Sequence, residues 1–307
     1  MRVLILLALS LSTIRGFNLT PRTRTLVRGG SGALRSDLLT NTNDIPIGNL
    51  ISEVDSLESS YMATPESRSD LYGDYAVLRT FNPSSPNPNS SNAAGGKWVR
   101  SNGITGRFFK VEGLFQNIVK EEGKPSAVNL VLLSFLSRLL CITVVLKGDC
   151  SFLTSSEITE IVSKRKTPNG LTSNSVRASF NSPMFRLSLL GYRSPFGVTF
   201  RLGPSSKVIL DASYVDSKLR IGKGASGVRF ILQRVTEGFK KDLWIPVVNS
   251  RFVVGKKGII GGLMSAGLGL IFKGGRGLKV LGGLCVGFAT VIVKSTGGIE
   301  EGKQAEV

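Results

Sequence analysis

VILDASYVDSKLRIGKGASGVRFILQ, at Val208–Gln233, combines strand and turn signals more densely than any other part of the chain. Both ends of this stretch are apolar and β-branched or aromatic, and its polar middle holds three glycines. Leu219 and Ile221 stand two residues apart, as they would on one face of a strand. The pattern therefore predicts three short strands joined by two tight turns.

The same stretch contains a G-x-G-x-x-G pattern at Gly222, Gly224 and Gly227, which is the spacing of a dinucleotide-binding loop. That loop needs a helix to begin at the third glycine, because the helix N-terminus binds the pyrophosphate. Here Val228–Val235 is a β-type run, and no acid stands about 20 residues beyond the last glycine. We therefore interpret the glycines as a tight hairpin turn.

The positive charge of the chain is concentrated at its two ends. The 307 residues carry a formal net charge of +18, and residues 1–36 and 255–294 each hold six basic residues and no acid. The body between them is only mildly basic, and its arginines are scattered singly without a known nucleic-acid-binding motif. We expect no nucleic-acid partner.

The absence of histidine excludes several kinds of catalytic or metal site. A Ser-His-Asp or Cys-His nucleophile pair, a histidine general base and a histidine-ligated metal all require that residue. Cys141, Cys150 and Cys285 form no C-x-x-C pattern and cannot all pair. We expect no catalytic residues, no metal and no cofactor. Carboxylate chemistry is the alternative that this composition leaves open.

The N-terminal residues have the composition of two successive targeting segments. Residues 1–16 contain Arg2 and the apolar run VLILLALSL, which has signal-peptide length, and residues 17–36 are rich in Arg, Ser and Thr and lack acids, like a transit peptide. A signal peptide joined to a transit peptide through Phe17 resembles the bipartite leader of proteins of algal secondary plastids. A plain secretory signal followed by a disordered arm is the alternative.

The body is predicted to be all-β. Residues 37–70 are polar, and we interpret them as a linker, or as a loosely docked helix near residues 51–59. The folded domain is expected at residues 71–250, where short β-type runs recur between Pro and Gly residues. The clearest runs are 71–81, 175–180, 185–190, 198–202 and 208–210. They predict an antiparallel barrel or sandwich, and a flat, half-open sheet is the alternative.

Three parts of the body are less regular. The apolar runs 128–133 and 139–146 fit either a buried strand or a short helix. Gly113 allows a bulge that shifts the alternation of a strand running from residue 106 to 118. Residues 151–174 contain Ile158, Ile161 and Val162 at helical spacing, which predicts a short insertion helix of one or two turns.

The C-terminal part consists of two uncharged, glycine-rich runs, Gly258–Phe272 and Val280–Val293, joined by a basic connector. Helices of that length reach about 21 to 23 Å, which is short of a hydrocarbon core of ~30 Å. Small residues recur four apart, as in membrane helices that pack closely: Gly258, Gly262 and Ala266, then Gly283 and Gly287. We interpret residues 251–294 as a membrane-associated helical hairpin and 295–307 as a polar tail. A soluble tail packed on the barrel is the alternative.

Three motifs carry a resemblance to a known family. They are Gly113-Leu114-Phe115-Gln116-Asn117, then RLGPSS at Arg201–Ser206, and Tyr214-Val215-Asp216 followed by LRIGKGASG at Leu219–Gly227. Together they resemble the plastid lipid-associated proteins, also called fibrillins, over roughly residues 72–233. The chain departs from that pattern at Ser217, where an acid is usual, and at Arg229, which enters a normally apolar last strand.

The resemblance implies a lipocalin-like barrel in a plastid, at thylakoids or lipid globules (plastoglobules), that handles an isoprenoid lipid such as a carotenoid or quinone. It supplies no catalytic residues. Its motif positions are structural or close to the ligand: Phe115, Gln116, Tyr214, Asp216, Arg220, Gly222, Gly224 and Gly227. An Asp216–Arg220 ion pair would close one end of the barrel, whereas the alternative gives both residues the role of fixing the hairpin.

Three functional hypotheses follow. The leading one is a non-catalytic protein that binds or organises isoprenoid-type lipids at a membrane or lipid-globule surface. The second is a solid-cored interaction domain that coats membranes or recruits a lipid-synthesis enzyme without a ligand of its own. The third is a carboxylate enzyme acting on an isoprenoid lipid through Asp211 and Asp216.

Overall fold

The computed structural model describes residues 38–39, 45–64, 66–84, 109–121, 123–135, 138–164, 171–224, 227–273, 275, 282–283 and 286. The predicted signal peptide, transit peptide and polar tail lie outside the described residues, as does most of the second apolar run, including Gly287.

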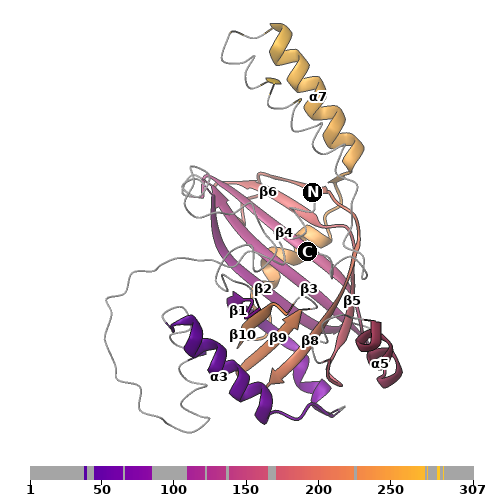
Figure 1. Cartoon of the computed structure of the whole chain (residues 1–307). Coiled ribbons are helices and arrows are strands. Elements are labelled where there is room, and N and C mark those ends of the chain that lie inside the picture. Colours follow the sequence, from indigo (N-terminus) through magenta and orange to yellow (C-terminus); the bar gives the residue numbers. More distant parts are fainter. Residues whose placement is uncertain are drawn as a thin grey trace.

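The described strands form one eleven-stranded sheet, part of which closes into a barrel (Figure 1). In the order of their neighbours around the ring, the barrel strands are β4 (Leu140–Phe152), β3 (Lys124–Phe135), β2 (Phe109–Glu121), β1 (Gly73–Phe81), β10 (Arg229–Val235), β9 (Leu219–Gly224), β8 (Ser206–Val215) and β5 (Val176–Phe180). β5 pairs with β4 and so closes the ring, and every pairing within it is antiparallel. The predicted all-β antiparallel barrel is confirmed, and its closed form is consistent with the lipocalin-like kind.

The remaining strands extend the sheet beyond the ring. β4 is long enough to have two neighbours on the same side: residues 140–145 pair with β6 (Met184–Leu189) and residues 148–152 pair with β5. β6 continues to β7 (Gly197–Arg201), which pairs in parallel with the short strand β11 (Val253–Val254). The sheet therefore forks along β4, where Gly148 allows the close passage of β5: a Cβ there would lie 2.2 Å from the backbone oxygen of Ser179.

The helix α3 (Ile47–Ser60) covers the outer face of β8, β9 and β10 (Figure 1). Leu50, Val54 and Leu57 recur at helical spacing and pack against the outward side chains of the barrel. A 3-10 helix, η1 (Glu66–Leu71), then leads into β1. Of the two alternatives for this region, the docked helix is present as α3, and it is firmly packed, because Leu50 and Val54 are fully buried.

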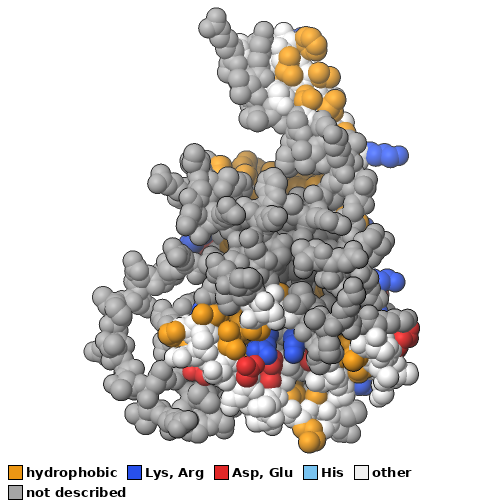
Figure 2. Space-filling model, viewed as in Figure 1, with side chains coloured by type: hydrophobic (Ala, Val, Ile, Leu, Met, Phe, Trp, Pro, Cys, Tyr) orange, Lys and Arg blue, Asp and Glu red, His pale blue; other side chains and the backbone are white. Residues whose placement is uncertain are grey.

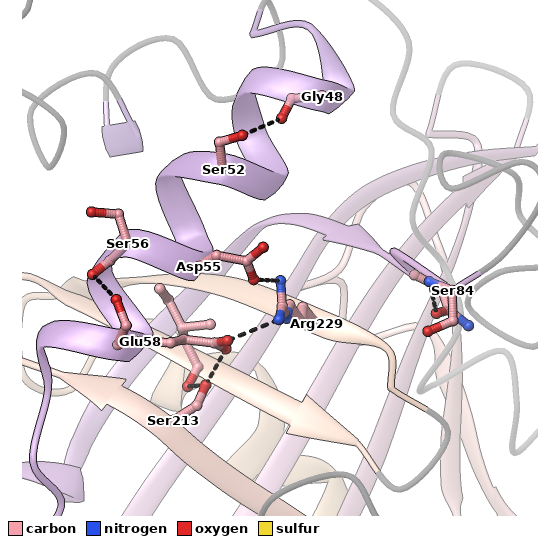
Figure 3. A network of polar contacts seen from close by, with 11 residues as sticks. Gly48, Ser52, Asp55, Ser56, Glu58, Ser84, Ser213 and Arg229 are labelled. Carbon is pink, nitrogen blue, oxygen red and sulfur yellow. Dashed lines mark hydrogen bonds and ion pairs between the residues drawn. The ribbon is translucent and has the colours of Figure 1, made fainter. Parts of the chain in front are cut away.

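Polar contacts also hold α3 on the barrel. The guanidinium of Arg229, on β10, lies 2.7 Å from the Asp55 carboxylate and 2.9 Å from that of Glu58 (Figure 3). Ser213 of β8 donates a hydrogen bond to Glu58 at 2.6 Å. Arg229, the basic residue in the otherwise apolar strand β10, is therefore the ion-pair partner of two acids on α3.

The two ambiguous apolar runs are strands, β3 and β4. Both of their faces are covered, because one side points into the barrel and the other lies under α6 (Lys241–Val248) with Trp244 and Val247. Continuous apolar sequence is the expected pattern for such a strand. The predicted bulge in β2 is confirmed, since its register with β3 shifts between Val111 and Gly113.

The predicted insertion helix is present as α5 (Ser155–Lys164) and is longer than expected. The hydroxyl of Thr154 accepts the backbone N–H of Glu157 at 3.3 Å, and the Glu157 carboxylate accepts the backbone N–H of Thr154 at 2.9 Å. This is a capping box, with Thr154 as the N-cap residue and Glu157 three residues later.

The first glycine-rich run is the helix α7 (Lys256–Lys273), which projects from the β6–β7 end of the barrel (Figure 1). Ile259, Ile260 and Leu263 pack against the inner core of the barrel. Among the described helices, none has the length and hydropathy needed to cross a membrane.

The predicted small residues of α7 and of the second run differ in their contacts. A Cβ on Gly258 would lie 3.0 Å from Cγ1 of Val254. A Cβ added to Gly262 or Gly283 would meet nothing within 4 Å, and Ala266 is exposed. A Cβ on Gly282 would lie 2.5 Å from the backbone oxygen of Gly267. Backbone approach therefore occurs between Gly267 and Gly282 instead.

Candidate functional site

The candidate site is a polar chamber inside the barrel, centred on Arg220. Along β9 the side chains alternate: Leu219 and Ile221 face outward and pack under α3, so Arg220 and Gly222 face inward. The side chain of Arg220 is enclosed, with 5% of its surface exposed. Both faces of β9 are buried, and the alternation of its side chains therefore places the charge of Arg220 inside the barrel.

Two small cavities border this arginine, and together we call them the barrel chamber. Their volumes are about 50 and 30 Å³. Both are lined by Gln116, Leu210 and Arg220. The larger one is also lined by Val77, Thr80, Leu114, Phe115, Asn129, Leu130, Gly222, Phe230 and Leu232, and the smaller one by mostly apolar residues of β2, β4, β5 and β8. The chamber is thus an apolar space with a few polar groups around one charge.

The charge on Arg220 has aromatic and cationic neighbours. Its guanidinium lies over the ring of Tyr75, 5.1 Å from the centroid, and that of Arg234 lies at the same distance from this ring. Burial lowers the pKa of Arg220, and the positive charge of Arg234 adds to this effect. Burial likewise raises the pKa of Tyr75. Among the described residues, no carboxylate forms an ion pair with Arg220.

A pair of side-chain amides completes the chamber. Gln116 on β2 stands opposite Asn129 on β3, and its Nε2 donates a hydrogen bond to Asn129 Oδ1 at 2.9 Å. Within the described part of the chain, Gln116 Oε1 and Asn129 Nδ2 have no hydrogen-bond partner, and neither do Nε and Nη1 of Arg220. If the oxygen and nitrogen of both side-chain amides exchange places, the pair still leaves one donor group and one acceptor unused.

Asp216 serves the hairpin and not the chamber. Its carboxylate accepts the backbone N–H groups of Lys218 and Leu219 at 2.6 and 2.8 Å, and the hydroxyl of Tyr214 at 2.7 Å. The Asp216–Arg220 ion pair is not among the hydrogen bonds and ion pairs of the described residues. The alternative role in the hairpin holds for Asp216, whereas Arg220 points into the barrel.

The other motif residues have structural positions. Gly227 has a φ of 81° and closes the turn between β9 and β10, in which the N–H of Gly224 donates to Val228 O at 2.8 Å. Antiparallel pairing of these strands confirms the hairpin interpretation of the G-x-G-x-x-G pattern. Phe115 borders the larger cavity, with its ring 5.4 Å from that of Phe239.

Three chamber residues were missed at the level of the sequence: Tyr75, Asn129 and Cys150. Asn129 carried a usable signal, since it is an amide within the apolar run of β3, at a position facing Gln116 across the pair. The Cys150 thiol lines the smaller cavity, where burial raises its pKa to about 11, so it is protonated at neutral pH.

A second feature is an exposed apolar surface where β6, β7 and β11 meet. We call it the apolar rim; its members are Leu139, Leu189, Leu190, Phe196, Val198 and Phe252. Backbone hydrogen bonds join Leu189 to Phe196 and Leu190 to Leu139. Phe196 is 68% exposed and Phe252 is 87% exposed. α7 begins four residues after Phe252, and Figure 2 shows apolar side chains along its surface.

Fold and site together define a closed antiparallel barrel with a small cationic chamber and an apolar rim. Comparisons with protein-family models, with curated proteins and with solved structures give no match.

Proposed function

We propose that the protein is a non-catalytic, lipid-associated barrel of the plastid that organises isoprenoid-type lipids, such as carotenoids and quinones, at a thylakoid or lipid-globule surface. The observation that carries the proposal is the apolar rim together with α7. Scattered apolar residues are normal on a protein surface, but a contiguous group marks a site of contact with lipid or protein. Lys257 and Lys273 are exposed on α7 and suit anionic head groups.

The proposed plastid location is based on the motif resemblance and on the composition of residues 1–36. The isoprenoid ligand class is based on the motif resemblance. The size of the barrel chamber supports organisation at a surface in preference to carriage inside the barrel. Pockets for extended ligands commonly enclose about 300–1,000 Å³. Cavities of about 50 and 30 Å³ are far below that range.

Vesicle flotation of the full chain tests the lipid contact. Vesicles of neutral and of anionic lipids, each with and without a long-chain quinone, should carry the protein upward. The double substitution of Phe196→Ser and Phe252→Ser should weaken the association at least about tenfold, because two exposed rings no longer leave water for the lipid.

Met62→Ser is the matched control, since Met62 is 83% exposed but lies between α3 and η1, away from the rim. It should float like the unchanged protein. Equal flotation of the double variant would remove the rim from the proposal. If the unchanged protein floats with none of these vesicles, the proposal itself is overturned.

The second candidate function is a solid-cored interaction domain that recruits another protein and carries no ligand. The small volume of the chamber favours it. Native purification followed by mass spectrometry of bound lipids separates the two candidates. A stoichiometric isoprenoid lipid would exclude the second, whereas a lipid-free protein that co-purifies with one defined enzyme would favour it.

A further inference from the structure

The side chain of Arg220 is a buried positive charge that no carboxylate of the described part of the chain neutralises. Removing a charged group from water costs several kcal/mol, so buried charges are normally paired. Arg229 follows this rule on the outer face of the barrel, where Asp55 and Glu58 neutralise it. Among the described residues, Arg220 on the neighbouring strand β9 has the ring and hydroxyl of Tyr75 beside it and no carboxylate in an ion pair.

The ionisable neighbours that most affect Arg220 do not supply the missing charge. They are Tyr75, Cys150 and Arg234. Tyr75 and Cys150 are neutral at ordinary pH, because burial raises both pKa values. Arg234 adds a second cation beside the same ring. The electrostatics of the chamber therefore favour an anion.

The unused hydrogen-bonding atoms of the chamber suggest the shape of that anion. Nε and Nη1 of Arg220 lack partners among the described residues, so N–H groups on two edges of its guanidinium are free to donate to the oxygens of an anion. The amide pair of Gln116 and Asn129 leaves one further donor at the wall of the larger cavity. Each of the three side chains is more than nine-tenths buried.

The rest of the larger cavity is apolar. Val77, Leu114, Leu210, Phe230 and Leu232 line it around the polar groups. A ligand that satisfies both parts of the wall has an anionic head and a hydrocarbon body. A volume of about 50 Å³ admits the head and the first carbons only, so a longer chain has to leave between the lining side chains.

We propose that the barrel chamber is a binding site for the carboxylate of an amphiphile, in which the guanidinium of Arg220 donates to the carboxylate and Asn129 or Gln116 donates a further hydrogen bond. The same chemistry comes from two sources, a free short-chain acid and a fatty-acid-type lipid. The proposal extends the lipid association proposed above, because it names an acidic lipid head as the group recognised inside the barrel.

Isothermal titration of the full chain without vesicles tests the site. The probes are hexanoate, a long-chain fatty acid below its aggregation limit, and the methyl ester and alcohol of the same two chains. Both acids should bind at least about tenfold more tightly than the neutral compounds, because charge-assisted hydrogen bonds are the stronger ones. Hexanoate binding alone would assign the site to free short-chain acids, and tighter binding of the long chain would assign it to a lipid.

Two variants and one matched control locate the binding. Arg220→Met should lose the preference for the acid over its ester, whereas Arg220→Lys should keep part of it, since the charge remains. Arg229→Met removes an equally enclosed arginine from the outer face and should leave the affinity for the acid unchanged. Thermal unfolding without ligand adds a readout: Arg220→Met should raise the midpoint or leave it unchanged, and Arg229→Met should lower it.

Equal affinity of the acid and its ester for the unchanged protein would overturn the proposal, even if no variant folds. Unchanged acid binding by Arg220→Met would also overturn it, as would failure of every acid to bind. Because these titrations contain no membrane, their failure is distinguishable from a failure of vesicle flotation.

Discussion

Asp216 and Arg220 lie four residues apart on one hairpin and have opposite surroundings. Asp216 remains half-buried at the turn, where three hydrogen bonds converge on its carboxylate. Arg220 is enclosed in the barrel. The difference follows from the strand period, because β9 begins between them and turns every second side chain inward.

Asp216→Ala should lower the free energy of unfolding by about 1–3 kcal/mol, because the turn loses an acceptor for two backbone N–H groups and the Tyr214 hydroxyl. Urea denaturation measures the effect, and Asp216→Asn, which keeps one acceptor oxygen, should recover part of it. When Asp216→Ala is combined with Arg220→Met, the two separate effects on the free energy of unfolding should add to within about 0.5 kcal/mol. A larger coupling would mean that the ion pair exists after all.

A few polar contacts fix the N-terminal end of the helix α5. In α5 the carboxylate of Glu157 accepts the backbone N–H and the hydroxyl of Thr154, both at 2.9 Å. It also pairs with Arg177 of β5 at 2.6 Å. The first turn of the helix is thereby capped and tied to the barrel.

These contacts predict a pH dependence. The backbone N–H of Thr154, then Arg177, lower the pKa of Glu157 from 4.5 to about 2. Because the folded pKa is the lower one, the stabilisation is fully present above about pH 4.5 and is lost as the pH falls through about 2. NMR titration of the Glu157 carboxyl carbon should give that midpoint, and Arg177→Gln should move it upward. A midpoint near 4.5 in the unchanged protein would contradict the cap.

Much of the element structure was predictable because it depends on neighbouring residues. Strand and turn signals at Val208–Gln233 alternate over a few residues and correspond to β8, β9 and β10. The capping box of Thr154 and Glu157 is equally local, since its two residues stand three apart in the sequence. In contrast, residues 37–70 are polar, and their sequence alone resembles a linker. The apolar surface that holds α3 lies on the outward face of the barrel strands, which are distant in the sequence.

The whole molecule depends on the closure of the ring at the fork in β4. Gly148→Ala should be destabilising by about 1–3 kcal/mol or more, because its Cβ would lie within 2.6 Å of backbone atoms of both Ser179 and Phe180. Thermal or urea unfolding measures the cost.

Gly222→Ala is the matched control, as another strand glycine of the same barrel. Its Cβ would meet Leu232 at an ordinary 3.6 Å, and the methyl group would enter the larger cavity. Gly222→Ala should change the free energy of unfolding by less than about 1 kcal/mol, because the added methyl group meets no clash and alanine lowers the conformational entropy of the unfolded chain. Equal costs for the two variants would show that closure does not depend on the absence of a side chain at Gly148.

Residue type and short-range spacing are enough to predict the all-β character, the hairpins of residues 208–233, the bulge at Gly113 and the absence of histidine chemistry. Three features follow from tertiary packing instead: β4 pairs with β5 to close the ring, α3 belongs to the core, and Arg220 faces a chamber with Gln116 and Asn129. Those outcomes depend on residues that are far apart in the chain and become neighbours only when the sheet closes. The stretch at Val208–Gln233 thus contains the charge of the candidate site, while the enclosure that gives this charge its chemistry comes from the other strands.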